Sequence, residues 1–194
     1  MDWQSSIKGF RSFLQLEKGL SENSIQAYVR DINKLFQFIE HEGLKISPTD
    51  ISLSHLQDFL VWANELGIEA RTQARVISGI KAYYKYLLLE DLMSNDPTEL
   101  LEGPKIGRKL PETLSIEEIN ELIDAIDLST HEGERNKCIL ETIYGSGLRV
   151  SEVTGLKISD IFKDEGFIKI TGKGDKERLV PIGSIALKQI ELYQ

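Results

Sequence analysis

The sequence predicts a mainly α-helical protein, in which a bundle of four helices is followed by a smaller unit that combines helices with a β-hairpin. Apolar residues recur every three or four positions through most of the first hundred residues, which is the period of a helix. From residue 167 the pattern alternates around a glycine-rich turn, which is typical of a hairpin. Between these regions, residues 102–112 (EGPKIGRKLPE) hold two glycines, two prolines and no apolar period. We therefore expect a helical domain over residues 1–101, a linker over 102–111 and a second domain over 112–194.

The four helices of the first domain have recognisable ends. The first ends at Gly19, and the second begins after Ser21, a residue type that caps helix N-termini well. A third begins between Thr49 and Ser54, and a fourth covers about residues 70–89. Short connections between four such helices are typical of a bundle. The residues expected to face its core are Ile7, Phe10, Phe13, Leu14, Ile25, Tyr28, Ile32, Leu35, Phe36, Ile39, Leu56, Phe59, Leu60, Ala63, Val76, Ile77, Ile80, Tyr83, Tyr84 and Leu87.

The second domain starts with a capping box, in which Ser115 precedes Glu118 by three residues ahead of an apolar helical stripe. Further helices are expected at about residues 134–144 and from Arg149 onward. Two strands then flank the turn at residues 172–175. Another helix is expected to contain Tyr193.

Composition limits the class of protein. Hydrophobic residues make up 41% of the chain, yet no apolar run has the length of a membrane span, and the N-terminus lacks a secretory signal. The single cysteine, Cys138, excludes an intramolecular disulfide, fits a cytoplasmic protein and lies in an apolar run that predicts a core position. We expect neither a metal nor a cofactor, because no P-loop or dinucleotide motif is present and the histidines lack metal-ligand spacing. Those histidines are His41, His55 and His131.

Basic residues cluster, although the chain as a whole is acidic. The formal net charge is −8, from 23 basic and 31 acidic residues. Net charge says little about nucleic-acid binding, because the positions of the basic groups decide it. Residues 70–89 and 103–111 carry basic residues and no acid, so both segments are candidate DNA contacts; the alternative is a solvated surface. Their basic residues are Arg71, Arg75, Lys81, Lys85, Lys105, Arg108 and Lys109.

Arg149 is the first candidate for chemistry. It follows a glycine-rich stretch at the start of a predicted helix, and Glu152 lies one turn later on the same face. A guanidinium bonds two phosphate oxygens at once and stays charged, so it suits a phosphoryl-transfer transition state. Glu152 would support the arginine from behind. The alternative is an exposed ion pair at spacing i, i+3, which is common and weak.

Lys173 is the second candidate, at the tip of the predicted hairpin. Gly172 and Gly174 keep that tip slim, so the lysine could enter a DNA groove and its ammonium could protonate a leaving oxygen. The alternative is an ordinary solvated turn lysine.

Two longer motifs resemble a known family. The stretches IYGSGLRVSEVTGLKISDI (143–161) and ITGKGDKERLVPIG (170–183) resemble the tyrosine recombinases, and in particular the bacterial Xer site-specific recombinases. GLSENSIQAYVRDINKLFQFIE is similar to the second helix of their N-terminal, SAM-like core-binding domain. ARTQARVISGIKAYYKYLLLEDLMSNDPTELLEGPKIGRKLP is similar to its fourth helix and the linker. The likeness extends over the whole chain.

The resemblance implies a C-shaped clamp on double-stranded DNA and a tetrameric recombinase. In that family a tyrosine forms a 3′-phosphotyrosyl bond, so neither ATP nor a metal is required. Arg149 matches the arginine that binds the scissile phosphate, Glu152 the acid that supports it, and Lys173 the lysine that acts on the leaving 5′-oxygen. The DNA contacts expected on this basis are Ser24, Arg71, Arg75, Lys81, Lys105, Arg108 and Lys109.

The chain departs from the family after the hairpin. The family's His-x-x-Arg pair, its further His or Trp and its nucleophilic tyrosine follow the hairpin. This chain has no histidine after His131 and no arginine after Arg178. Tyr193 follows the hairpin too soon to be the nucleophile. We therefore expect a partial catalytic domain that does not cleave DNA by itself, and a monomer is plausible for it.

Three functions remain open from the sequence. The first is a truncated Xer-like recombinase whose parent resolves chromosome dimers, with a phage or transposon integrase as its variant. The second is a DNA-binding clamp or regulator without catalysis. The third is a helical protein-interaction domain, which would show no salt-dependent affinity for DNA.

Overall fold

The computed structural model describes residues 1–107, 110–172, 174 and 176–194. The chain forms two compact units, Met1–Lys109 and Leu110–Gln194, and each has its own hydrophobic core. Within the described residues, no helix is both long enough and apolar enough to cross a membrane.

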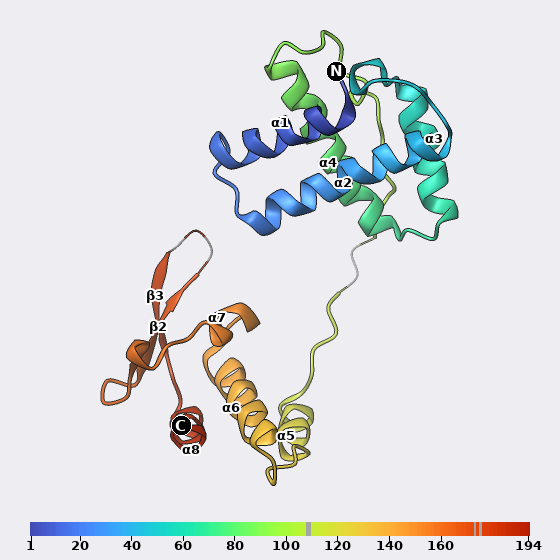
Figure 1. Ribbon diagram of the computed structural model, residues 1–194. Helices are drawn as coiled ribbons and strands as arrows, with labels where there is room; N and C mark the ends of the chain where they lie inside the picture. The colour runs from blue at the N-terminus through green and yellow to red at the C-terminus, as the bar shows by residue number, and fades with distance from the viewer. Residues whose placement is uncertain (108–109, 173, 175) are drawn as a thin grey trace. The chain divides into compact units, whose positions relative to one another are not determined.

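The first unit is the predicted four-helix bundle (Figure 1). Its helices are α1 (Trp3–Leu16), α2 (Glu22–His41), α3 (Leu53–Glu65) and α4 (Ala70–Leu89), with a short 3-10 turn, η1 (Pro48–Asp50), before α3. All four predicted helices are therefore confirmed. Of the residues predicted to face the core, all are buried except three that are partly buried and pack against it. Those three are Tyr28, Phe36 and Leu60.

Aromatic rings fill the centre of this bundle. Tyr83 in α4 has no exposed surface, and its ring lies edge-on to Phe10 of α1, with 5.3 Å between the ring centroids. The Tyr83 hydroxyl forms a hydrogen bond with the Ser6 hydroxyl, and the Tyr84 hydroxyl donates to the Pro48 carbonyl at 3.2 Å. Buried hydroxyl groups need such partners, so these two bonds tie α4 to both α1 and η1.

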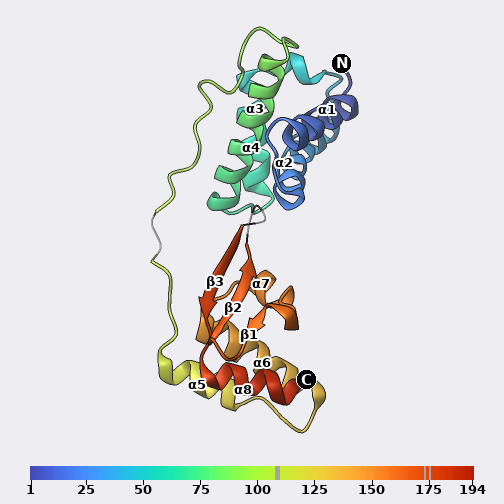
Figure 2. The ribbon, with the colours of Figure 1, turned by 90° about the vertical axis from the view of Figure 1, so that its left-hand side faces the viewer.

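The second unit packs helices against a small antiparallel sheet. Its elements are α5 (Ile116–Asp124), α6 (His131–Ser146), α7 (Val150–Thr154), the turn η2 (Ile158–Asp160), β1 (Ile161–Phe162), β2 (Phe167–Thr171), β3 (Glu177–Pro181) and α8 (Ser184–Tyr193). The strands have the order β1-β2-β3, and α6 lies beside α8 (Figure 2). The hairpin and the helix around Tyr193 are confirmed. Strand β1 was not predicted, because two residues are too few to show a period.

The core of the second unit is small, and the sheet supplies part of it. Ile168 and Ile170 of β2 are buried, together with Ile182 after β3 and Ala186 and Ile190 of α8. Cys138 also belongs to this core, as predicted, and burial raises the pKa of its thiol. The predicted capping box at the start of α5 is present too, because Ser115 and Glu118 exchange hydrogen bonds between side chain and backbone.

Candidate active site and DNA interface

The glycine-rich stretch before Arg149 ends one helix and starts the next. Helix α6 ends at Ser146, and Gly147 has the left-handed conformation (φ 61°) that glycine adopts without strain. The turn buries Leu148 and leaves Arg149 as the N-terminal capping residue of α7. The glycine therefore determines where the arginine lies, one residue beyond a buried anchor.

Glu152 lies beneath Arg149 and is buried. Its carboxylate accepts a hydrogen bond from the Arg149 backbone N–H at 2.8 Å and another from Nη1 of the same arginine at 3.0 Å. The Glu152 side chain is 4% exposed, whereas that of Arg149 is 74% exposed. An ordinary surface ion pair has two exposed partners. Here the buried Glu152 carboxylate binds the backbone N–H and Nη1 of Arg149. The rest of the guanidinium is exposed to solvent.

Arg178 of β3 is a second arginine on the same carboxylate. Its Nη1 and Nη2 donate to Oε1 and Oε2 of Glu152 at 2.8 and 2.9 Å, which is the bidentate geometry. We call Arg149, Glu152 and Arg178 the Glu152 cluster. Sequence reasoning did not identify Arg178 as part of the site. A signal was available, because Arg178 alternates with Val180 and Ile182 and so lies on the core-facing side of its strand.

The two arginines keep Glu152 ionised. The hydrogen bonds from the Arg178 side chain, followed by the bond from the Arg149 backbone, lower the pKa of Glu152 to about 2. The same carboxylate raises the pKa of Arg178. With two guanidinium groups and one carboxylate, the cluster carries one positive charge, and Arg149 is its exposed end.

The hairpin turn starts against this cluster. Gly172 lies at the end of β2, and its N–H donates to the Lys176 carbonyl at 2.8 Å. A β-carbon at this glycine would lie 3.2 Å from Nη1 of Arg178 and 3.7 Å from Oε1 of Glu152. A β-carbon at Gly172 would therefore crowd the Arg178 guanidinium, which would have to move by a few tenths of an ångström. Lys173, the next residue and a predicted catalytic group, lies outside the described residues.

The other predicted DNA contacts belong to the first unit. Arg71, Arg75 and Lys81 are exposed on α4, as the periodicity predicts. Ser24 is partly buried near the start of α2, and its hydroxyl lies 3.0 Å from that of Ser21. Lys105 is exposed beyond the bundle, and Arg108 and Lys109 lie outside the described residues.

Arg75 differs from its neighbours on α4 because an ion pair already holds it. Its Nη1 donates to Oδ2 of Asp31 in α2 at 2.6 Å, and Asp31 is buried. Sequence reasoning did not find this partner, which lies 44 residues away along the chain.

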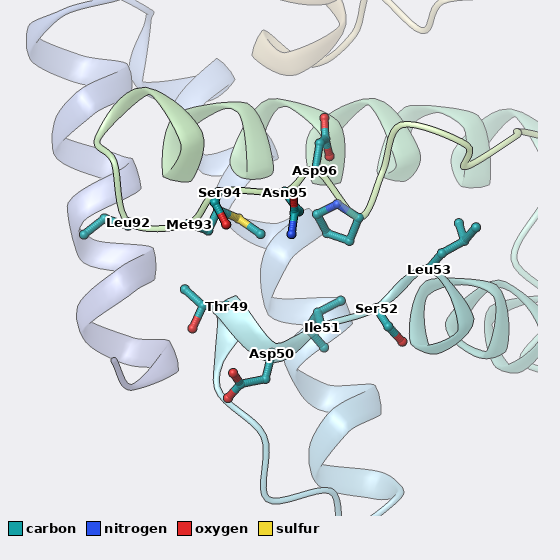
Figure 3. A pocket seen from close by; sticks show the side chains of 11 residues that line it. Thr49, Asp50, Ile51, Ser52, Leu53, Leu92, Met93, Ser94, Asn95 and Asp96 are labelled. Carbon is teal, nitrogen blue, oxygen red and sulfur yellow. The ribbon is translucent and has the colours of Figure 1, made fainter.

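One polar pocket of the first unit is separate from these residues. A pocket of about 400 Å³ lies between η1 and the segment after α4 (Figure 3). Two acids line it, but Asp50 accepts hydrogen bonds from Ser47 and Asp96 accepts them from Thr98, and their carboxylates point in different directions. In the described part of the chain, no three His, Cys, Asp or Glu side chains are placed to hold a metal ion.

Comparison with known proteins agrees with both units. Residues 7–91 match the family described as phage integrase, N-terminal SAM-like domain, and residues 112–193 match the phage integrase family. The tyrosine recombinase XerD of Staphylococcus haemolyticus is 37% identical over 191 residues, which is 98% of this chain and 64% of that protein. The chain thus spans about two thirds of the length of the curated relative.

Solved structures show the same fold. A lambda integrase tetramer bound to a Holliday junction matches with a TM-score of 0.72 and 17% identity, over 98% of this chain and 55% of that one. The XerH site-specific recombinase bound to difH substrate matches with a TM-score of 0.66 and 26% identity, over 88% of this chain and 52% of that one. Since both units match integrase families and the XerD likeness extends over nearly the whole sequence, the chain belongs to the phage integrase family of tyrosine recombinases.

Proposed function

We propose that the chain is the DNA-clamping domain and the first part of the catalytic domain of a bacterial site-specific recombinase that acts in the cytoplasm. One observation carries the proposal: a buried glutamate holds the highly exposed guanidinium of Arg149. A positive group fixed in this way suits the transition state of phosphodiester cleavage, because its donors need no reorganisation when charge develops on the phosphate oxygens. Likeness to XerD favours resolution of chromosome dimers over integration of mobile DNA.

In the proposed reaction each residue has a defined step. The hydroxyl of the family's nucleophilic tyrosine attacks the scissile phosphorus and loses its proton to solvent, and a 3′-phosphotyrosyl bond forms as the bond to the 5′-oxygen breaks. Arg149 binds the non-bridging oxygens, Glu152 orients Arg149, and Lys173 gives a proton to the 5′-oxygen. The covalent intermediate conserves the bond energy, so rejoining needs neither ATP nor a metal. In the family this occurs in a tetramer on double-stranded DNA.

DNA binding should be strongly dependent on salt. Fluorescence anisotropy with a 30-base-pair duplex should show that affinity falls steeply between 50 and 200 mM salt, with a log–log slope of about −0.9 for each phosphate contacted. Replacing Arg71 and Arg75 by alanine should weaken binding and reduce the magnitude of the slope by about 2. Replacing Lys8 and Arg11 of α1 removes the same charge and should change the slope less. Unchanged affinity in the α4 variant would exclude that helix from the interface.

The 194-residue chain by itself should not form a covalent DNA complex. The residues that match the family include neither the His-x-x-Arg pair nor the nucleophilic tyrosine. Incubation with a nicked duplex that traps the phosphotyrosyl bond, followed by denaturing electrophoresis, should give no shifted protein band. A covalent band would show that a tyrosine of this chain, such as Tyr193, is the nucleophile.

A clamp that binds DNA without cutting it is the second candidate. Retention of Arg149, Glu152 and Lys173 together favours an enzyme over such a clamp. The codons that follow Gln194 in the gene distinguish the two. A His-x-x-Arg pair and a later tyrosine would support the enzyme, and an immediate stop codon would support the clamp.

A further inference from the structure

The first unit contains a second buried acid that holds an exposed arginine. Asp31 lies in the middle of α2 with its side chain 3% exposed, and its Oδ2 accepts a hydrogen bond from Nη1 of Arg75 at 2.6 Å. The Arg75 side chain is 48% exposed. Among the described residues, Oδ1 of Asp31 is buried without a hydrogen-bond partner. We call Asp31 and Arg75 the Asp31 pair.

The backbone of α4 leaves space for this carboxylate. Gly79 lies one turn after Arg75, and a β-carbon there would lie 2.8 Å from both Cβ and Oδ2 of Asp31. Any other residue would therefore push α2 and α4 apart. The combination of the glycine and the acid means that the two helices cross with the carboxylate enclosed between them.

The Asp31 pair is not explained well by stability. Burial raises the pKa of Asp31, and this outweighs the opposing effect of nearby cations, of which Arg75 is the strongest. Apolar residues in place of a buried ion pair are often as stable or more stable. A buried carboxylate with one unpartnered oxygen therefore contributes little to the stability of the α2–α4 packing. It is well suited to fixing one guanidinium in one orientation.

Two further cations lie near Asp31. Lys34 and Arg30 of α2 lie close enough to act on the charge of Asp31, and α4 carries no acid along its length. A guanidinium has five N–H donors, and Asp31 occupies one of them. The remaining donors can bind two oxygens of one phosphate. The Asp31 pair thus repeats in the first unit the arrangement of Arg149 on Glu152.

We propose that Asp31 is a positioning residue that holds Arg75 ready for one backbone phosphate of DNA, with Arg30 and Lys34 flanking the same phosphodiester. The inference rests on the proposed function, since it presumes that α4 binds DNA. Charge and positioning predict opposite changes in DNA affinity when Asp31 is replaced. Removing the charge of Asp31 makes the surface more positive, which by charge alone would tighten DNA binding. Loss of positioning instead weakens binding, because Arg75 must then be ordered when DNA arrives.

The test measures DNA affinity of the 194-residue chain by anisotropy at fixed salt. Asp31→Asn should weaken binding about threefold to tenfold, the entropic cost of ordering a free arginine side chain. In an Arg75→Met background the same change should have no further effect. The matched control is the exposed ion pair of Arg11 and Glu22, in which Nη2 of Arg11 lies 2.7 Å from Oε1 of Glu22. Glu22→Gln should leave binding unchanged or slightly tighter.

Each outcome decides a separate point. A wild-type chain without salt-dependent affinity would overturn both this inference and the proposed function. If the wild-type chain binds DNA and Asp31→Asn leaves that affinity unchanged or raises it, this inference alone is overturned. The same holds if Asp31→Asn lowers the affinity equally in the Arg75→Met background. Should Asp31→Asn fail to fold, Arg75→Lys replaces it, because lysine keeps the charge without the planar fork. The Arg75→Lys variant should bind DNA about threefold to tenfold less tightly than the wild-type chain. Equal affinity of the two proteins would overturn the proposal.

Discussion

The Glu152→Gln variant should unfold its second unit at a temperature about 5–10 °C below that of the parent chain. The carboxylate accepts four hydrogen bonds from two arginines, and it joins the start of α7 to strand β3. Glutamine keeps the shape but offers one acceptor oxygen, so two guanidinium groups would face an amide N–H₂ and each other. Differential scanning calorimetry measures the shift, and hydrogen exchange assigns it to peptides of α7 and β3.

The control for this variant is Glu191→Gln. Glu191 pairs with Lys163 at 3.1 Å on the surface, and such pairs contribute little. An equal shift in both variants would contradict the account of the Glu152 cluster.

The pH dependence provides an independent check on Glu152. Its pKa is lowered from 4.5 to about 2 in the folded chain, so its stabilising contribution is complete above about pH 4.5 and is lost as the pH falls toward 2. The difference in melting temperature between the parent and Glu152→Gln should therefore narrow over that interval. A difference that stays constant from pH 6 to pH 3 would show that Glu152 is not held as the structure indicates.

The second large effect is expected for Gly79→Ala, which should destabilise the first unit. Alanine is ordinarily the better helix former by about 1 kcal/mol. Here its methyl group would lie 2.8 Å from Cβ of Asp31, an atom that no rotamer change can move away, so α2 and α4 must separate. Overpacking of this kind costs about 1–3 kcal/mol, and we expect it to exceed the gain in propensity. Urea unfolding followed by the fluorescence of Trp3 and Trp62 reports on this unit.

Gly145→Ala is the matched control, with the opposite expected sign. Gly145 is also a helical glycine, but a β-carbon there would meet only Cβ of Ala186 at 3.9 Å, an ordinary contact. That variant should be more stable by about 0.5–1 kcal/mol, as followed by calorimetry. If Gly79→Ala were stabilising as well, the close crossing of α2 and α4 would be wrong.

Much of the fold could be predicted because its signals are local. The stripe of apolar residues in α2 and α4 predicts both helices and their buried faces, because apolar residues recur with the helical period of 3.6 residues. The capping box at Ser115 and the glycine-rich hairpin turn are equally local, because a few neighbouring residues satisfy their own backbone groups. Strand β1 has only two residues, so its sequence shows no periodicity. It forms because its backbone pairs with the edge of β2 that β3 does not occupy.

The sequence by itself determined the helical bundle, the hairpin and the presence of Arg149 beside an acid one turn away. Only the tertiary structure decided that Glu152 is buried, that Arg178 shares its carboxylate, and that Asp31 holds Arg75 across the crossing of two helices. The physical reason is distance along the chain. Glu152 and Arg178 lie 26 residues apart, and Asp31 and Arg75 lie 44 apart. Periodicity tells which face of an element is buried, whereas the packing of elements on one another decides which charges meet there.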